Sequence, residues 1–230
     1  MKLAIMQPYL FPYIGYFQLI SSADKFVFYD DVNFIKNGWI NRNRIIVSGS
    51  AKYITVPLRD ASSFLKINRV HFIDDSKKIL KTIEQSYKKA PYFDQIWPIV
   101  VSSFQYRTDL ISELAIQSIR AVCAYLGIDK EFEISSEKYS RTQDLTGPRR
   151  IIEICRINSA TDYNNPIGGV NLYNKDEFRQ SGIELHFIKR KEIVYKQSIQ
   201  GFIPDLSIID VLMFNSKETV INYLGQFEVL

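Results

Sequence analysis

The chain has 230 residues, of which 46% are hydrophobic and 23% are charged, which is the composition of a globular protein and excludes a disordered chain. The formal net charge is +4, from 29 basic and 25 acidic residues. This excess is too small by itself to indicate nucleic-acid binding, and the length suits one domain.

The first elements alternate strand, helix and strand. Residues 2–6, KLAIM, read as a short buried strand, and residues 13–23, YIGYFQLISSA, carry apolar positions at helical spacing. Residues 25–31, KFVFYDD, read as a second strand. Such a unit predicts a right-handed parallel crossover. Residues 32–72 then hold short β-branched segments between turn-like stretches, which predicts an antiparallel β insertion.

From residue 75 onward the apolar period becomes helical. One helix is predicted over residues 76–90. A second is predicted over residues 109–126, where Thr108 or Asp109 can cap its start and Gly127 ends it.

The second half returns to alternation. The predicted elements are strands over 131–135, 160–164 and 183–188, helices over 148–158 and 174–182, and a tail of two helices over 205–230. Strands that alternate with helices indicate an open parallel sheet covered on both faces. The predicted architecture is therefore α/β, with a Rossmann-like, mainly parallel sheet in a single domain over 1–230, a β insertion over 32–72 and a helical C-terminal tail.

The loop after the first strand is long, apolar and stiffened by prolines. In an open parallel sheet, ligands bind beyond the carboxyl ends of the strands. Gln7 and Tyr9 follow the first strand directly, and Asp30 and Asp31 end the second, so both pairs are expected in one crevice. Gly15 would permit close backbone approach at the start of a helix. The alternative for this loop is a hydrophobic plug over the sheet edge.

Residues 30–44, DDVNFIKNGWINRNR, follow without a clean helix or strand period. Lys36 and Arg42 could hold phosphates, and Trp39 could stack on a base or a sugar. A surface hairpin with ordinary charges is the alternative.

Two further features stand in the C-terminal half. Gly168 and Gly169 follow a strand and precede a capped helix, which suits a phosphate-binding loop or a plain turn. Asp210 lies one turn inside an otherwise apolar helix and needs a partner if it is buried.

Other chemistries have little support. His71 and His186 lie within strands, and no catalytic triad, P-loop, GxGxxG or HExxH motif occurs. Cys123 and Cys155 lack a CxxC spacing, so no zinc site is predicted and both are expected to be buried thiols in a reducing compartment. No secretory signal and no membrane-spanning run is recognised, which predicts a cytoplasmic protein without membrane insertion.

Five segments together resemble the WbqC-like family nearly end to end. They are MQPYLFPYIGYFQLI, ADKFVFYDDVNFIKNGWINRN, YKKAPYF, NPIGGVNLYNKDEF and FIPDLSIIDVLMFNS. The family is known mainly from bacterial O-antigen and other surface-polysaccharide gene clusters, so the resemblance implies lipopolysaccharide biosynthesis and a glycine or other aminoacyl transferase acting on an amino sugar. Many members have a histidine before the Gln-Pro pair, where this chain has Met6.

A second resemblance concerns the fold. The strand, the proline-bearing loop and the following helix are similar to the opening of HIGH-type nucleotidyltransferases. Gly15 and Tyr16 stand where those enzymes carry Gly-His. The similarity implies a Rossmann-like sheet rather than adenylyl transfer.

The first functional hypothesis is a transferase that N-acylates the amine of a nucleotide-linked sugar. It needs a base, donors for the tetrahedral oxyanion and groups that hold the diphosphate. The hypothetical roles are Asp30 or Asp31 as the base, Gln7 or Asn41 as the oxyanion donor, Lys36 and Arg42 on the diphosphate, and Tyr9 and Trp39 as stacking rings. The other predicted substrate-binding residues are Gly15, Tyr16, Asn43, Gly168, Gly169 and Asp210.

Two alternatives remain. One is magnesium-dependent nucleotidyl transfer with Asp30 and Asp31 as metal ligands. The other is a non-catalytic binding or scaffolding subunit. The first hypothesis needs no metal and no tightly bound cofactor. Its acyl donor stays open between coenzyme A, a carrier protein and aminoacyl-tRNA, as does the oligomeric state, a homodimer included.

Overall fold

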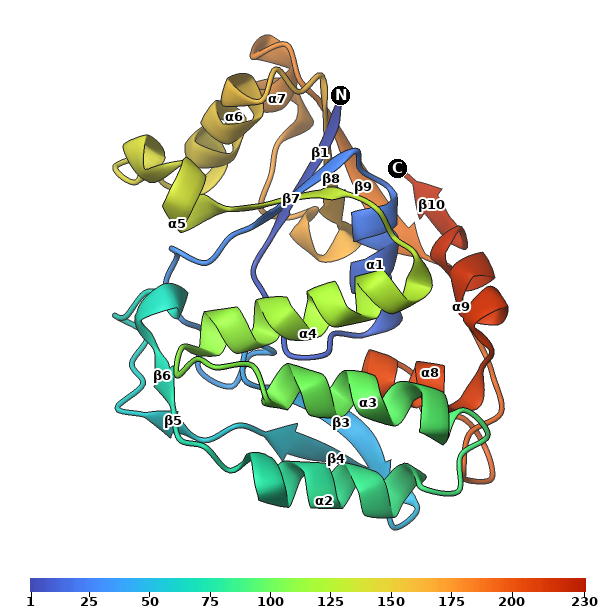
Figure 1. Cartoon of the computed structure of the whole chain (residues 1–230). Helices are drawn as coiled ribbons and strands as arrows, with labels where there is room; N and C mark the ends of the chain where they lie inside the picture. Colours follow the sequence, from blue (N-terminus) through green and yellow to red (C-terminus); the bar gives the residue numbers. More distant parts are fainter.

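A six-stranded sheet forms the centre of the protein (Figure 1), as a computed structural model of residues 1–230 shows. Its strands are β1 (Lys2–Met6), β2 (Lys25–Phe28), β7 (Glu131–Ile134), β8 (Asp162–Pro166), β9 (Glu184–Arg190) and β10 (Phe227–Val229). They lie in the order β10-β9-β8-β1-β2-β7, and every pair is parallel except β9–β10. Read from the β7 edge, the sheet has the strand order 3-2-1-4-5-6 of the Rossmann fold. This confirms the predicted mainly parallel, Rossmann-like sheet.

The direction of winding changes between β1 and β8. Leu3 of β1 is in register with Lys25 of β2 on one side and with Tyr163 of β8 on the other. In folds of this kind the ligand crevice lies outside the carboxyl ends of the two strands at this switch point. For this chain, those ends are the loop after Met6 and the segment after Pro166.

Helices cover both faces of the sheet, as the continuous apolar strands predict. On one side lies a core of 39 buried residues, to which α1 (Ile14–Ser21), α4 (Ile111–Leu126), α8 (Ile208–Phe214) and α9 (Lys217–Leu224) contribute side chains. The other face packs against α6 (Gly147–Ile157) and α7 (Lys175–Gln180), in a cluster of 14 buried residues. Alternate residues of β1 enter different clusters, Ala4 the larger one and Leu3 and Ile5 the smaller one. The two separate cores therefore follow from the two-residue period of a strand.

The β insertion has the predicted antiparallel character. Strand β3 (Arg42–Val47) pairs with β4 (Ser50–Thr55), and the short β5 (Leu58–Arg59) pairs with β6 (His71–Phe72). Within the insertion, Ile67–Arg69 form a 3₁₀ turn shortly before β6. Figure 1 shows β3 and β4 beside α2 (Ser76–Tyr87) and α3 (Phe93–Phe104), away from the central sheet.

The structure differs from the sequence-based elements in three places. Helix α3 was not predicted, because Pro98 stands inside it and proline argues against a helix interior. The tail contains the two expected helices but ends in β10, which adds an antiparallel edge to β9. The short helix α5 (Ser135–Lys138) follows β7 directly and was not predicted; its first residue, Ser135, was assigned to the strand. Helix α4 ends at Gly127 as expected, with a φ of +74° that suits glycine.

Candidate functional site

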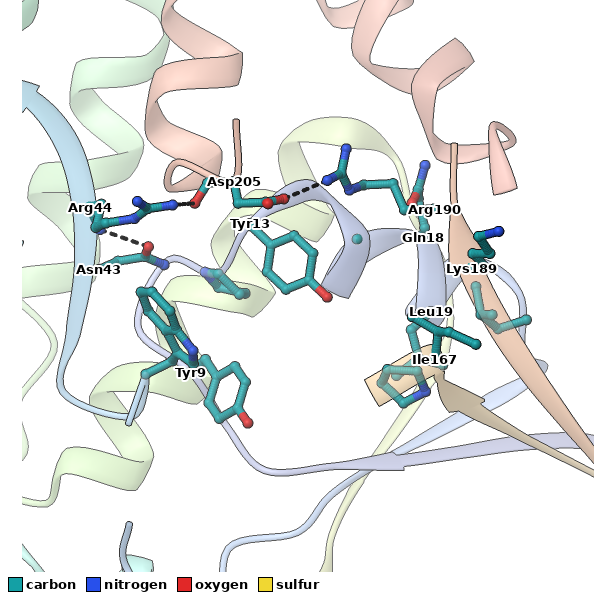
Figure 2. A pocket seen from close by; sticks show the side chains of 15 residues that line it. Tyr9, Tyr13, Gln18, Leu19, Asn43, Arg44, Ile167, Lys189, Arg190 and Asp205 are labelled. Carbon is teal, nitrogen blue, oxygen red and sulfur yellow. Dashed lines mark hydrogen bonds and ion pairs between the residues drawn. The ribbon is translucent and has the colours of Figure 1, made fainter. Parts of the chain in front are cut away.

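A cavity of about 530 Å³ lies at the switch point of the sheet. Its walls come from the β1–α1 loop and α1, from the ends of β8 and β9, from the insertion around β3, and from the segment before α8 (Figure 2). Its lining residues are Tyr9, Pro12, Tyr13, Gly15, Gln18, Leu19, Trp39, Asn43, Arg44, Pro166, Ile167, Ile188, Lys189, Arg190 and Asp205. The position and the volume are those of a small-molecule site in a doubly wound fold.

The proline-stiffened loop after β1 has both of the roles considered for it, a hydrophobic plug and a wall of the ligand cavity. Leu10 and Phe11 are fully buried and act as a plug, while Tyr9, Pro12 and Tyr13 line the cavity. The main chain of Phe11 lies at a φ of +40°, outside the usual region for a bulky residue. The same loop therefore seals the core with one set of side chains and forms the cavity wall with another.

Hydrogen bonds from three different elements hold this loop. The Asn43 amide of β3 donates to the carbonyls of Leu10 at 3.1 Å and Phe11 at 2.7 Å. The Phe11 N–H donates to the Ser118 hydroxyl of α4 at 3.0 Å, and the Ser207 hydroxyl donates to the Phe11 carbonyl at 2.8 Å. Asn43 was predicted to bind substrate; the structure shows it positioning the aromatic loop at the cavity wall. These bonds lie in the protein interior and fix the loop before any ligand arrives.

Aromatic side chains form one side of the cavity. Figure 2 shows Tyr9 and Tyr13 with their hydroxyl groups directed into the open space. The Leu10 N–H donates to the Trp39 carbonyl at 3.1 Å, which keeps the insertion beside the loop. Burial raises the pKa of Tyr9 to about 12 and also raises that of Tyr13, where Asp205 adds to the effect and Arg190 opposes it. Both hydroxyls are therefore protonated at neutral pH and can donate hydrogen bonds.

Charged groups of Arg44, Lys189 and Arg190 also line the cavity, and both arginines contact Asp205. Arg44 of β3 donates through Nη2 to the carbonyls of Pro204 at 3.1 Å and Asp205 at 3.2 Å. Arg190 of β9 donates to Oδ1 of Asp205 at 2.7 Å, and the Lys189 ammonium lies 3.8 Å from Glu228. A guanidinium has five N–H donors, so each arginine keeps donors that are free for an anion.

The cavity wall also holds polar atoms that no protein group satisfies. In the whole chain, three buried side-chain atoms have no hydrogen-bond partner: Gln18 Oε1, Arg44 Nε and Asn68 Oδ1. Gln18 and Arg44 both line this cavity. Buried polar atoms are nearly always paired in folded proteins. Two of the three exceptions therefore belong to residues of this cavity wall, although the two atoms themselves are buried.

Asp30 and Asp31 do not line this cavity, contrary to the expectation of one shared crevice. Both are buried at the end of β2, next to the residues that follow β7. Asp30 accepts hydrogen bonds from the N–H and the hydroxyl of Ser136, and Asp31 accepts from the Ser135 hydroxyl and, at 2.5 Å, from Arg150 of α6. Burial raises the pKa of the Asp30 carboxyl, and the bonds from Ser136 partly oppose this.

The strand order explains this separation. The carboxyl ends of β1 and β2 lie at the same edge of the sheet, but the switch point opens between β1 and β8. The end of β2 lies on the other side of β1, where α5 and α6 cover it. Asp30 and Asp31 are therefore members of a buried polar network.

Lys36, Asn41 and Arg42 line a separate cavity of about 280 Å³ in the insertion. The Asn41 amide donates to the Val56 carbonyl at 2.9 Å. The Arg42 guanidinium donates to the carbonyls of Gly38 and Asn37 and lies 4.4 Å from the centre of the Tyr53 ring. The structure thus places the two predicted phosphate-binding cations outside the cavity that holds Tyr9 and Trp39.

Two of the remaining predicted residues lie next to the β1–α1 loop. Tyr16 is buried, and its hydroxyl donates to the Gln7 carbonyl at 2.8 Å, so this pair shapes the end of β1. Neither residue lines the cavity.

The predicted glycine pair and Asp210 have different surroundings. Gly168 and Gly169 belong to a 3₁₀ turn over Ile167–Gly169 that follows β8 directly, and Ile167 lines the cavity. A Cβ on Gly169 would stand 1.9 Å from the Asn165 amide nitrogen, which accounts for glycine there. Asp210 is buried and accepts from the hydroxyls of Tyr87 at 2.8 Å and Tyr195 at 2.7 Å. It has the partners that its burial requires and does not line the cavity.

Sequence reasoning did not select six of the polar residues that line the cavity: Tyr13, Gln18, Arg44, Lys189, Arg190 and Asp205. For Lys189 and Arg190 a usable signal existed. Ile188, Lys189 and Arg190 end the strand after β8, so the rule that pointed to the first loop also points to them. The positions of Asp205 and Arg44 at the cavity depend on how the insertion and the tail pack against each other, and no local sequence pattern shows this.

Gly15 offers a direct test of the cavity wall. A Cβ at this position would stand 2.3 Å from Cε2 of Tyr13, so the Gly15→Ala variant should force the Tyr13 ring out of its position. We expect shifted Tyr13 ring resonances in NMR spectra of a specifically labelled protein. Gly168→Ala is the matched control, because nothing lies within 4 Å of a Cβ there. Unchanged Tyr13 resonances in Gly15→Ala would contradict the described packing.

No metal site is evident from side-chain geometry. No group of three or more histidine, cysteine, aspartate or glutamate side chains gathers in an arrangement that could hold an ion. His71 and His186 each pair with one aspartate, Asp109 at 2.8 Å and Asp162 at 2.9 Å. No helix has the length and apolar character required to cross a membrane.

Comparison with known proteins gives a family match along nearly the whole chain. The model of the WbqC-like protein family matches residues 7–222. The chain is also 31% identical, over 229 residues, to a protein of Mycobacterium tuberculosis (strain ATCC 25618 / H37Rv) described as uncharacterized protein Rv1507c, covering 97% of each chain. No solved structure matches the chain.

Proposed function

The chain belongs to the WbqC-like protein family, and from this premise we propose that it is a transferase of bacterial surface-polysaccharide biosynthesis that acylates the amine of a nucleotide-linked amino sugar. One observation carries the proposal: the switch-point cavity combines aromatic rings with two arginines in one space of about 530 Å³. Flat rings and guanidinium groups are the surfaces that a base or sugar and a diphosphate require.

The parts of such a ligand have counterparts in the cavity. The free N–H groups of Arg44 and Arg190 suit the diphosphate, because arginine binds phosphate oxygens in a forked geometry. Tyr9, Tyr13 and Trp39 offer rings for a base or a sugar. This assignment replaces Lys36 and Arg42 by Arg44 and Arg190 and retains Tyr9 and Trp39 from the sequence-based hypothesis.

The reaction joins the amine nitrogen to the carbonyl carbon of an acyl thioester or ester. The ammonium first gives one proton to solvent water; the amine nitrogen then attacks the carbonyl carbon and forms the new C–N bond, the C–S or C–O bond breaks, and the leaving thiolate or alkoxide takes the second proton from the nitrogen. The negative charge on the carbonyl oxygen needs hydrogen-bond donors at the point of attack. The protonated hydroxyls of Tyr9 and Tyr13 suit this role better than Asn41, whose amide is bound to Val56.

Magnesium-dependent nucleotidyl transfer is less well supported. It assigned the metal to Asp30 and Asp31, but all four of their carboxylate oxygens accept hydrogen bonds from protein groups. A non-catalytic binding subunit would use the same cavity without turnover. The coenzyme A, carrier-protein and aminoacyl-tRNA forms of the donor share the same acyl chemistry, so the proposal covers each of them.

Thermal denaturation tests the proposed ligand. A uridine- or deoxythymidine-diphosphate amino sugar at about 100 times its Kd should raise Tm by about 5–10 °C, because a ligand that binds only the folded state stabilises it. Free glucosamine at the same concentration is the control and should give no shift, since it lacks the diphosphate. The absence of a shift with every nucleotide-linked sugar would contradict the proposal.

A further inference from the structure

Asp205 is the one carboxylate among the residues that line the switch-point cavity. We infer that Asp205 recognises the ammonium group of the substrate and thereby selects an amino sugar over the corresponding hydroxy sugar. The inference rests on the proposed function, because it assigns a part of the same ligand to a residue of the same site. It adds a specificity determinant that the sequence did not indicate.

Two arginines hold Asp205 in place. Arg44 of β3 donates to the carbonyls of Pro204 and Asp205, while the Ser207 N–H donates back to the Arg44 carbonyl at 2.8 Å. Arg190 of β9 contacts the Asp205 side chain at 2.7 Å. The main chain of Asp205 lies at a φ of +57°, a left-handed conformation that costs free energy in most residues but is tolerated by aspartate and asparagine. A strained residue held from two elements is positioned before a ligand binds.

One oxygen of the Asp205 carboxylate is free. Oδ1 accepts the bond from Arg190, whereas Oδ2 accepts no hydrogen bond, and the side chain is 46% exposed. Figure 2 shows the carboxylate near Arg190 at the edge of the space above Tyr13. A cation is therefore able to reach Oδ2 while Arg190 keeps its own contact with Oδ1.

The surrounding charges make this oxygen selective for an amine. Arg44, Lys189 and Arg190 give the cavity a positive wall, so an isolated cation would be repelled everywhere except at Asp205. A ligand that carries both phosphates and one ammonium satisfies the arginines and Asp205 together. A hydroxyl in place of the ammonium makes only a neutral-donor hydrogen bond, which is weaker than a bond between two charged groups.

Isothermal titration calorimetry with UDP-glucosamine and UDP-glucose tests the inference. At a pH well below the pKa of the sugar amine, the wild-type protein should bind UDP-glucosamine about tenfold or more tightly. The Asp205→Asn variant should bind both ligands with similar Kd values. Raising the pH well above the amine pKa should remove the preference in the wild type, which a merely structural role for Asp205 would not produce.

Asn is the informative replacement because it keeps the shape of Asp205 and tolerates its positive φ, so the variant should fold. Asp176→Asn is the matched control: this exposed aspartate pairs with Arg179 at 3.1 Å on α7, outside the cavity, and should keep the wild-type preference. Equal binding of both sugars by the wild type, or an undiminished preference in Asp205→Asn, would overturn the inference alone. Failure of the wild type to bind any uridine- or deoxythymidine-diphosphate sugar would overturn the proposed function and the inference with it.

Discussion

Replacing Arg150 by methionine should lower the free energy of unfolding by about 3–5 kcal/mol, the cost of leaving a buried charge without its partner. Arg150 lies 2.5 Å from Asp31, and both side chains are almost fully buried, at 3% and 1% exposure. The guanidinium also donates to the Thr142 hydroxyl at 3.1 Å. Methionine fills much of the same space but leaves the Asp31 carboxylate with only Ser135 and Gln143 as donors. Urea denaturation followed by circular dichroism measures the loss.

Arg156 on the same helix provides the control for this substitution. Its ion pair with Glu153, at 3.8 Å, is exposed, so Arg156→Met should change stability by about 1 kcal/mol or less. Adding Asp31→Asn to Arg150→Met should restore part of the loss, because the neutral amide leaves no unpaired charge. Equal stabilities of Arg150→Met and Arg156→Met would show that the buried pair does not hold α6 against the end of β2.

This buried network shows where sequence reasoning about the site reached its limit. Two aspartates at the end of a predicted strand have the sequence signature of a catalytic or metal-binding pair, and the carboxyl-end rule placed them at the correct edge of the sheet. The position of the crevice along that edge depends on strand order, and β8 pairs with β1 only after more than half of the chain has been built. No local pattern near Asp30 carries that information.

The rule that ligands bind beyond the carboxyl ends of the strands correctly indicated the loops at the switch point. The loop after β1 and the Gly-Gly turn after β8 were both selected from sequence, and both border the cavity. Their signals were local: prolines and aromatic residues after one strand, and glycines after another. Alternating periodicity also sufficed for the parallel sheet and for helices on both of its faces. It failed for α3, where Pro98 interrupts the helical signal, and for β10, which is only three residues long.

The insertion posed a different difficulty. Its hairpin places Asn43 and Arg44 at the switch-point cavity and Arg42 at a separate cavity. The sequence offers the two arginines in nearly the same surroundings, within WINRNR, and the choice between them depends on how β3 sits against the β1–α1 loop. That contact is made by Asn43 through the carbonyls of Leu10 and Phe11, which are distant from it in the chain.

The second large expected effect is on ligand affinity, and it distinguishes Arg44 from Arg42. Arg44→Met should weaken the binding of UDP-glucosamine by about 10–100-fold, the range expected for the loss of charge-assisted hydrogen bonds to a phosphate. The substitution also removes the hydrogen bonds to the carbonyls of Pro204 and Asp205, so the segment that carries the Asp205 carboxylate is held less firmly. Methionine keeps the aliphatic stem and its packing, which limits the change in stability. Calorimetric Kd values measure the effect.

Arg42→Met is the matched comparison, because it removes the same charge two residues away on the same strand. The Arg42 guanidinium is occupied by the carbonyls of Gly38 and Asn37 and by the Tyr53 ring, so its loss should leave the Kd within about twofold of the wild type. The two variants separate the two candidate phosphate sites. Strong loss in Arg42→Met with wild-type affinity in Arg44→Met would move the nucleotide to the insertion cavity beside Lys36, and the switch-point cavity would then need another ligand.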